Sequence, residues 1–167
     1  MDRYEFSIRD TTTYGSRYKR LEMYLRSAPL LYIGIGYSSE AIDTNPSEDL
    51  EEIKGLICIR KINKLLLVKE SSCGSYKVKG RLWEESKDKP THIYINAFIN
   101  KDDFKEDRFN IIGIISNPLL NTNQIKDVYS SLDIRNQGLL HWIAYMTPIS
   151  RLEVSYKLPE LNLLIKI

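Results

Sequence analysis

The segment from Phe109 to Leu120 constrains the fold more than any other part of the chain. It is an apolar run rich in isoleucine that stops at Ser116, Asn117 and Pro118. Isoleucine is branched at Cβ, which favours extended backbone and packs well on a pleated surface. Apolar side chains occupy both odd and even positions, so we expect both faces of this strand to be covered, as in the centre of a sheet. The proline lacks an N–H and restricts the residue before it, which ends the strand.

Other segments have the composition of strands, and together they predict a mixed domain built on a sheet. Candidate neighbours of the central strand are His92–Ile99, Gly138–Ile149 and Glu160–Ile167. The charged link from Lys101 to Arg108 is short enough for a hairpin-like return between His92–Ile99 and the central strand. Further strands are expected at Leu30–Tyr37, Leu65–Val68 and Tyr76–Trp83, the last with Val78 and Leu82 facing inward.

Outside the strands, the sequence predicts an N-terminal arm and two short helices. Residues 1–15 are polar and include three consecutive threonines, which is typical of an arm that is ordered only by docking. Ser16 suits the N-cap of a helix near residues 16–27. A second helix is expected near residues 48–58, because acids at its start suit the helix dipole and its apolar side chains would share one face. No repeat or linker interrupts residues 16–167, so we expect a single mainly-β domain there.

Composition narrows the class of protein. The chain has 167 residues, enough for one domain with a real core. Its net charge of +2, from 24 basic and 22 acidic residues, is too balanced to predict nucleic-acid binding. The first ten residues are polar and charged, and no apolar run reaches the roughly 18 residues of a membrane span. The 11 tyrosines suit either a protein interface or boundary positions on sheets.

Histidine and cysteine give no sign of a metal or catalytic centre. His92 and His141 have no Cys, Asp or second His at ligand spacing, so zinc is not expected. His141 lies in an apolar strand, and we expect a packed, hydrogen-bonded side chain. Cys58 and Cys73 lack metal-site spacing and an identifiable activating base, and are expected to be reduced structural thiols.

The remaining candidate motifs also favour structural interpretations. The run Gly34-Ile35-Gly36 lacks the third glycine of a phosphate-binding turn, so its glycines are expected to mark a bulge or a close backbone approach. The carboxylate pairs Glu84-Glu85 and Asp102-Asp103 lie in charged stretches that are typical of solvated turns. The sequence therefore predicts no enzyme, no cofactor and no metal site.

Short motifs follow one another along the chain in a characteristic order. A strand ends in Ile115-Ser116-Asn117-Pro118-Leu119, a later strand ends in Thr147-Pro148-Ile149, and Glu160-Leu161-Asn162-Leu163 opens the last strand. Near the N-terminus, Tyr37-Ser38-Ser39-Glu40 follows a strand and precedes an acidic loop. In this order the motifs resemble the baseplate wedge subunit of contractile-tailed, T-even-type bacteriophages, the product of gene eight. That family has a long middle segment where this chain has only a turn between Lys69 and Lys77, so contacts through that segment are not carried over.

The resemblance implies an α+β, mainly β fold with an antiparallel β-sandwich-like core and a few short helices. It also implies a virion protein of the tail baseplate, made in the host cytoplasm, that forms a homodimer and joins other baseplate wedge proteins. It implies no catalysis, no small-molecule substrate, no nucleic acid and no membrane insertion. Wedge subunits hold their neighbours and change arrangement when the tail contracts.

Two alternative functions stay open from the residues alone. One is a small phage-encoded inhibitor that binds a host protein. The other is a nucleic-acid-binding module that uses basic residues of the first predicted helix together with Tyr18 and Tyr24; the basic residues are Arg17, Lys19, Arg20 and Arg26. For any binding role, exposed irregular segments are the expected contact regions: Met1–Tyr14, Ser38–Glu48 and Asn121–Asn136, the last with one helical turn near Gln124–Tyr129.

Overall fold

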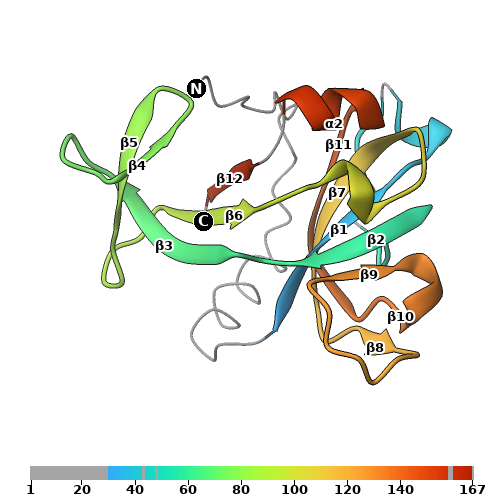
Figure 1. The fold of residues 1–167 in the computed structure, drawn as a ribbon. Coiled ribbons are helices and arrows are strands. Elements are labelled where there is room, and N and C mark those ends of the chain that lie inside the picture. Colours follow the sequence, from blue (N-terminus) through green and yellow to red (C-terminus); the bar gives the residue numbers. More distant parts are fainter. Residues whose placement is uncertain (1–29, 43, 48, 158–159, 167) are drawn as a thin grey trace.

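Strands dominate the computed structural model of the chain, which describes residues 30–42, 44–47, 49–157 and 160–166. Within these residues the strands form two five-stranded sheets and one two-stranded sheet, and all pairings between them are antiparallel (Figure 1). Helices in this part of the chain are short. The structure therefore confirms the mainly-β α+β fold with antiparallel sheets.

The first sheet has the strand order β11-β7-β1-β2-β9, and the second has the order β12-β6-β3-β5-β4. The first consists of β11 (Leu139–Ser150), β7 (Arg108–Ser116), β1 (Leu31–Gly36), β2 (Leu56–Lys61) and β9 (Val128–Ser130). The second consists of β12 (Leu161–Lys166), β6 (His92–Ala97), β3 (Lys64–Glu70), β5 (Arg81–Glu85) and β4 (Tyr76–Val78). The small sheet pairs β8 (Leu119–Leu120) with β10 (Ile134–Asn136). The helices are η1 (Ser39–Ala41), η2 (Lys101–Asp103), η3 (Ser131–Asp133) and α2 (Arg151–Lys157).

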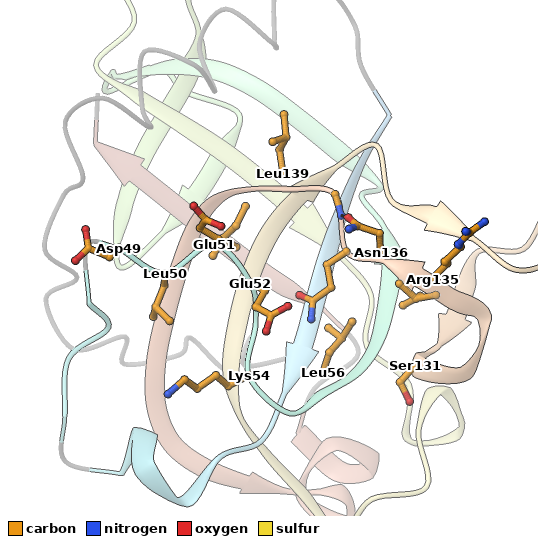
Figure 2. Close-up of a pocket in the computed structure, with 14 residues that line it drawn as sticks. Asp49, Leu50, Glu51, Glu52, Lys54, Leu56, Ser131, Arg135, Asn136 and Leu139 are labelled. Carbon is orange, nitrogen blue, oxygen red and sulfur yellow. Dashed lines mark hydrogen bonds between the residues drawn. The ribbon is translucent and has the colours of Figure 1, made fainter.

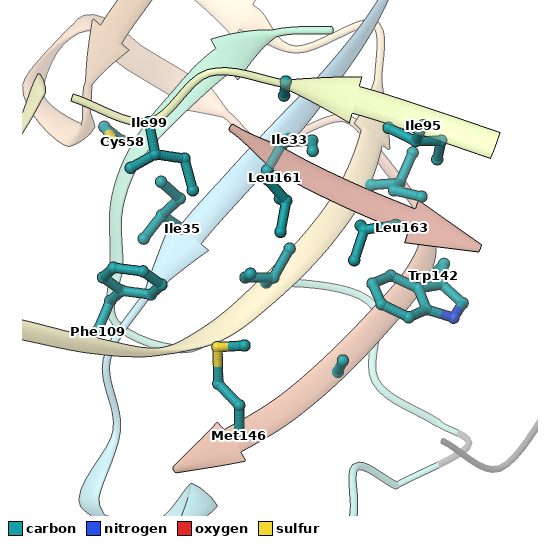
Figure 3. Packing of buried hydrophobic residues seen from close by; sticks show 14 of the residues in the cluster. Ile33, Ile35, Cys58, Ile95, Ile99, Phe109, Trp142, Met146, Leu161 and Leu163 are labelled. Atoms are coloured by element: carbon teal, nitrogen blue, oxygen red, sulfur yellow. The ribbon is translucent and has the colours of Figure 1, made fainter. Parts of the chain in front are cut away.

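The main core lies between the two large sheets. Ile33 and Ile35 contribute from the first sheet, and Ile95 and Leu163 contribute from the second (Figure 3). The chain passes between the sheets through β2 and β3, which Figure 1 shows as one nearly continuous ribbon. Strands that bend from one sheet into the other are a usual way to close the corner of such a two-layer core.

The central strand is confirmed, but two of its predicted neighbours are wrong. Strand β7 is buried from Phe109 to Ser116 and pairs with β1 and β11. The segments predicted as His92–Ile99 and Glu160–Ile167 pair instead with each other, as β6 and β12 of the second sheet. The link after β6 does not make a hairpin, because Phe104 turns into the core against Phe109, at 5.8 Å between ring centroids. This places β6 and β7 in different sheets.

The helix predicted near residues 48–58 is also wrong. Strand β2 begins at Leu56, and residues 49–55 run without a helix over the outer face of the first sheet. Ile53, 1 % exposed, is their anchor. It packs where Gly34 of β1 pairs with Gly113 of β7, and a Cβ on these glycines would lie 2.4 and 2.7 Å from its terminal methyl carbon. The apolar side chains of this segment thus cover a sheet instead of sharing a helix face.

The segment predicted as a strand over Tyr76–Trp83 is two strands, β4 and β5, joined by Lys79 and Gly80. Both joining residues have positive φ, 50° and 75°, as a tight two-residue hairpin turn requires. The turn changes the side-chain alternation, so Val78 is buried as expected, while Leu82 is exposed and Trp83 is buried in its place.

The remaining predictions of secondary structure have different outcomes. Residues 124–129 contain no helical turn, and β9 begins at Val128. The predicted strands at Leu30–Tyr37 and Leu65–Val68 are confirmed as β1 and β3. The arm at residues 1–15 and the helix near residues 16–27 lie outside the described residues.

Candidate interaction surface

Residues 117–138, between the ends of β7 and β11, form a separate feature that we call the lobe. It contains β8, η3 and β10, and its β9 extends the edge of the first sheet beside β2 (Figure 1). The lobe includes the whole of the segment Asn121–Asn136 that the sequence nominated for partner contacts. The lobe is therefore the region of the described structure that corresponds to this predicted contact segment.

Two residues with positive φ define the base of the lobe. Asn117 has a φ of 52° where the chain leaves β7, and Gly138 has a φ of 81° where it enters β11. A Cβ on Gly138 would lie 2.0 Å from the Ser116 carbonyl oxygen, so only glycine fits here. The Oγ of Ser116 lies 2.7 Å from His141 Nε2, and both side chains are buried. This hydrogen bond joins β7 to β11 beside the lobe and confirms the prediction of a packed, hydrogen-bonded His141.

Tyr129 fixes the interior of the lobe to the first sheet. Its ring is 4 % exposed and packs edge-on against Tyr32 of β1, with 6.1 Å between the centroids. Its hydroxyl accepts a hydrogen bond from the backbone N–H of Lys126 at 3.0 Å and donates one to the Gln124 carbonyl at 3.2 Å. These bonds hold the polar loop before β9 in a defined shape.

Asp133 ties the two halves of the lobe together. Its carboxylate pairs with Lys126 Nζ at 3.1 Å and accepts from the Ser130 backbone, while its carbonyl accepts from the Asn121 N–H at 2.7 Å. The hydrogen bond to Lys126 and the backbone bond from Ser130 both hold the pKa of Asp133 below its ordinary value, the first having the larger effect. The lobe is thus an ordered platform rather than a loose loop.

The outside of this platform is unusually apolar. Ile125 is 97 % exposed and Leu132 is 87 % exposed, and Leu119 and Leu139 are about half exposed, at 59 % and 48 %. A single exposed leucine is common on protein surfaces. Four large aliphatic side chains on one short segment and its base are more typical of a surface that contacts another protein.

A groove lies between the lobe and the segment that carries Ile53. It has a volume of about 860 Å³ and is lined by residues 49–52, 54 and 56 on one side and by residues 131 and 134–140 on the other (Figure 2). The Gln137 side chain joins the two sides: its Oε1 accepts from the Ile53 N–H at 2.8 Å, and its Nε2 donates to the Ile53 carbonyl at 3.0 Å. Sequence patterns did not reveal this groove, since it depends on residues more than eighty positions apart.

The groups considered for chemistry remain apart in the fold. Cys58 is buried in the main core, where burial, aided by nearby carboxylates, raises the pKa of its thiol to about 12, whereas Cys73 is exposed. His92 stacks edge-on against Trp83, and burial lowers its pKa. Among the described residues, no three His, Cys, Asp or Glu side chains gather in a way that could hold a metal ion.

In each of the two carboxylate pairs, one acid is held by a close ion pair. Asp103 pairs with Arg60 of β2 and accepts from the Asn100 N–H, while Asp102 is exposed. Glu84 pairs with Lys69 across β3 and β5. The glycines of β1 behave as expected: the register shifts between Ile35 and Gly36, and both Gly34 and Gly36 receive a close approach by Ile53.

The loop at Ser38–Glu48, a second nominated contact region, is partly tied to the sheet. Ser38 exchanges backbone hydrogen bonds with the Asn110 side chain, at 3.0 Å and 2.8 Å, and Ile42 is 41 % exposed. The third region, Met1–Tyr14, lies outside the described residues. A contact role for either segment stays a prediction.

Comparison with protein-family models and with curated proteins finds no match to this chain. Within the described residues, no helix has the length and apolar character needed to cross a membrane.

Proposed function

We propose that this chain is a structural subunit of a contractile phage tail, placed in the baseplate wedge, where it joins neighbouring wedge proteins during assembly and contraction. The observation that carries the proposal is the lobe: an ordered platform on the edge of a two-sheet core that exposes Ile125 and Leu132 almost completely. Exposed aliphatic side chains on a fixed support favour contact with protein. The order of sequence motifs, which resembles that of the wedge subunit, is the reason for proposing the baseplate wedge as the assembly.

In this proposal the two-sheet core acts as a rigid support and the lobe carries the contacts. Lobe residues are held by Tyr129 and Asp133, so little ordering entropy remains to be lost on binding. Such preorganisation suits a structural subunit that holds neighbouring proteins in place. We expect the subunit to act as a homodimer that contacts other wedge proteins.

The same lobe would also serve a small phage-encoded inhibitor of a host protein. The two functions differ in where the protein ends up. Peptide mass spectrometry on purified phage particles, with copy number measured against the major tail proteins, separates them. A few copies in each particle, in proportion to the number of wedges, are expected for the wedge subunit. Absence from particles would overturn the wedge proposal and favour the inhibitor.

A double variant, Ile125→Ser with Leu132→Ser, tests the lobe itself. Both side chains are nearly fully exposed, so we expect normal folding by circular dichroism and a loss of incorporation into particles. Leu82→Ser is the matched control, because Leu82 is also exposed but lies on β5 of the second sheet. Normal incorporation of the double variant would exclude the lobe as the contact surface.

A further inference from the structure

We propose that the groove between residues 49–56 and 131–140 binds an extended segment of a partner protein in which basic side chains flank an aliphatic one. The inference deepens the proposed function by naming the chemistry of one partner contact, and it rests on that function as a protein-binding subunit. It concerns a surface that adjoins the apolar outside of the lobe and shares Leu139 with it. Its support comes from the unpaired charges, the apolar lining and the backbone geometry of the groove.

The charges of the groove are unbalanced. Asp49, Glu51 and Glu52 are exposed on one side, and none of them takes part in an ion pair within the described part of the chain. Lys54, the cation on the same side, is engaged with Glu40 at 3.1 Å. Figure 2 shows Arg135, the cation on the other side, projecting outward rather than across the groove. The mouth of the groove therefore has a net negative electrostatic potential.

Several carboxylates elsewhere in the described structure have a cation partner. Glu70 pairs with Arg81, Glu84 pairs with Lys69, and Asp133 pairs with Lys126, each at 3.1 Å. Others in that part of the chain, such as Glu85 and Asp107, have none, so an exposed acid without an ion pair is not in itself a site. Three such acids along one side of a groove favour a cationic occupant of that groove. Lysine or arginine side chains would supply that charge, while nucleic acid, a polyanion, would be repelled.

The lining also contains apolar side chains between the charged ones. Leu50 and Leu56 on one side and Ile134 on the other are partly buried and pack against the cluster on the outer face of the first sheet. Leu139 is about half exposed at the same groove. An aliphatic side chain placed among them would remove apolar surface from water on both partners.

Backbone geometry favours an extended occupant. The two sides of the groove are linked by the Gln137 side chain, which uses both its amide atoms on the Ile53 backbone. The N–H groups of Asp49 and Leu50 bond to Ser47, so Glu51 and Glu52 are residues of this side whose backbone is open to a partner. Extended peptide segments commonly bind through such open backbone groups.

The test uses purified full-length protein and two fluorescent peptides that share one length, one with a Lys-Leu-Lys core and one with a Glu-Leu-Glu core. Fluorescence anisotropy is expected to give saturable binding of the lysine peptide that weakens as salt is raised, and no binding of the glutamate peptide. The double variant Glu51→Lys with Glu52→Lys is expected to weaken binding by about tenfold or more. Absence of lysine-peptide binding at millimolar protein, or equal binding of both peptides, would overturn the proposal.

The matched control is Glu85→Lys with Asp88→Lys. Both residues are exposed, and the change in charge is the same, but they lie at and beyond the end of β5, in the second sheet and its following loop. This variant is expected to keep at least half of the affinity for the lysine peptide. An equal loss of affinity in both variants would mean that overall charge, and not the groove, determines binding, and would overturn the assignment of the groove. Thermal melts of both variants confirm that they are folded.

Two other results would overturn the assigned occupant. If the Glu51→Lys, Glu52→Lys variant changes the sedimentation coefficient of the protein alone, a second copy of this chain occupies the groove. If the variant binds the peptide normally, the acids play no part. Neither result depends on particle composition, so failure of the groove proposal and failure of the wedge proposal are distinguishable by the mass-spectrometry measurement.

Discussion

The outer face of the first sheet and the outer face of the lobe both carry isoleucine, with opposite consequences. Ile53 is 1 % exposed and fills the space above Gly34 and Gly113, whereas Ile125 is 97 % exposed and contacts mostly water. The two residues are chemically identical, and both lie in segments without regular structure. Side chains on the sheet face therefore stabilise the fold itself, whereas those on the lobe are available for contacts that stabilise an assembly.

The largest expected effect separates these two isoleucines. Ile53→Ala removes a fully buried side chain and leaves a cavity over the glycines, so we expect a loss of about 4 kcal/mol in the free energy of unfolding. Ile125→Ala is the matched control and should cost about 0.5 kcal/mol or less. Chemical denaturation of both variants measures the difference. Equal effects would mean that the segment 49–55 does not depend on Ile53 for its position.

The next effect concerns the boundary between core and lobe. Gly138→Ala places a Cβ at positive φ and against the Ser116 carbonyl oxygen, so we expect a loss of about 3 kcal/mol. Gly80 has a similar φ, 75°, but nothing lies within 4 Å of its Cβ position. Gly80→Ala should therefore cost only about 1 kcal/mol, from backbone strain alone. Unfolding curves in which both variants lose the same amount would contradict the crowding at the lobe base.

The smallest effect tests the hydrogen bond beside that boundary. Ser116→Ala removes the Oγ partner of His141 Nε2 and leaves a buried ring nitrogen without that bond, so we expect a loss of about 1.5 kcal/mol. Hydrogen exchange at the ends of β7 and β11 should rise in the same variant. Ser130→Ala, on the exposed part of the lobe, is the control and should leave exchange at these strand ends unchanged. Unchanged exchange in Ser116→Ala would show that the bond does not hold the lobe base.

Much of the strand pattern could be predicted from sequence because it depends on local chemistry. Apolar residues at both parities identified β7 as a covered strand, a long apolar run identified β11, and alternation identified β6 and β12. Their assignment to sheets could not be predicted in the same way. Whether the link after β6 makes a hairpin or crosses between sheets depends on where Phe104 finds its buried contacts, and those contacts come from another part of the chain.

The candidate site shows the same limit. Its polar composition led to the nomination of Asn121–Asn136 as a contact segment, and the structure shows there an ordered platform with exposed aliphatic side chains. The groove had no sequence signal, since its two sides meet only through the bonds of Gln137 to Ile53. The failed helix near residues 48–58 has a related cause: Leu50 and Ile53 fit a helical spacing, but the glycines of β1 and β7 offer a better burial for Ile53.

The sequence by itself determined a domain built on a sheet, the covered central strand, the packed His141 and the place where β7 stops. These follow from side-chain branching, polarity and the restrictions of proline, which act over a few residues. Only the tertiary structure decided which strands share a sheet, that Ile53 lies over paired glycines, and that the lobe and the 49–56 segment enclose an acidic groove. Those features depend on long-range burial and shape, because a glycine can receive a side chain only where the fold brings one to it.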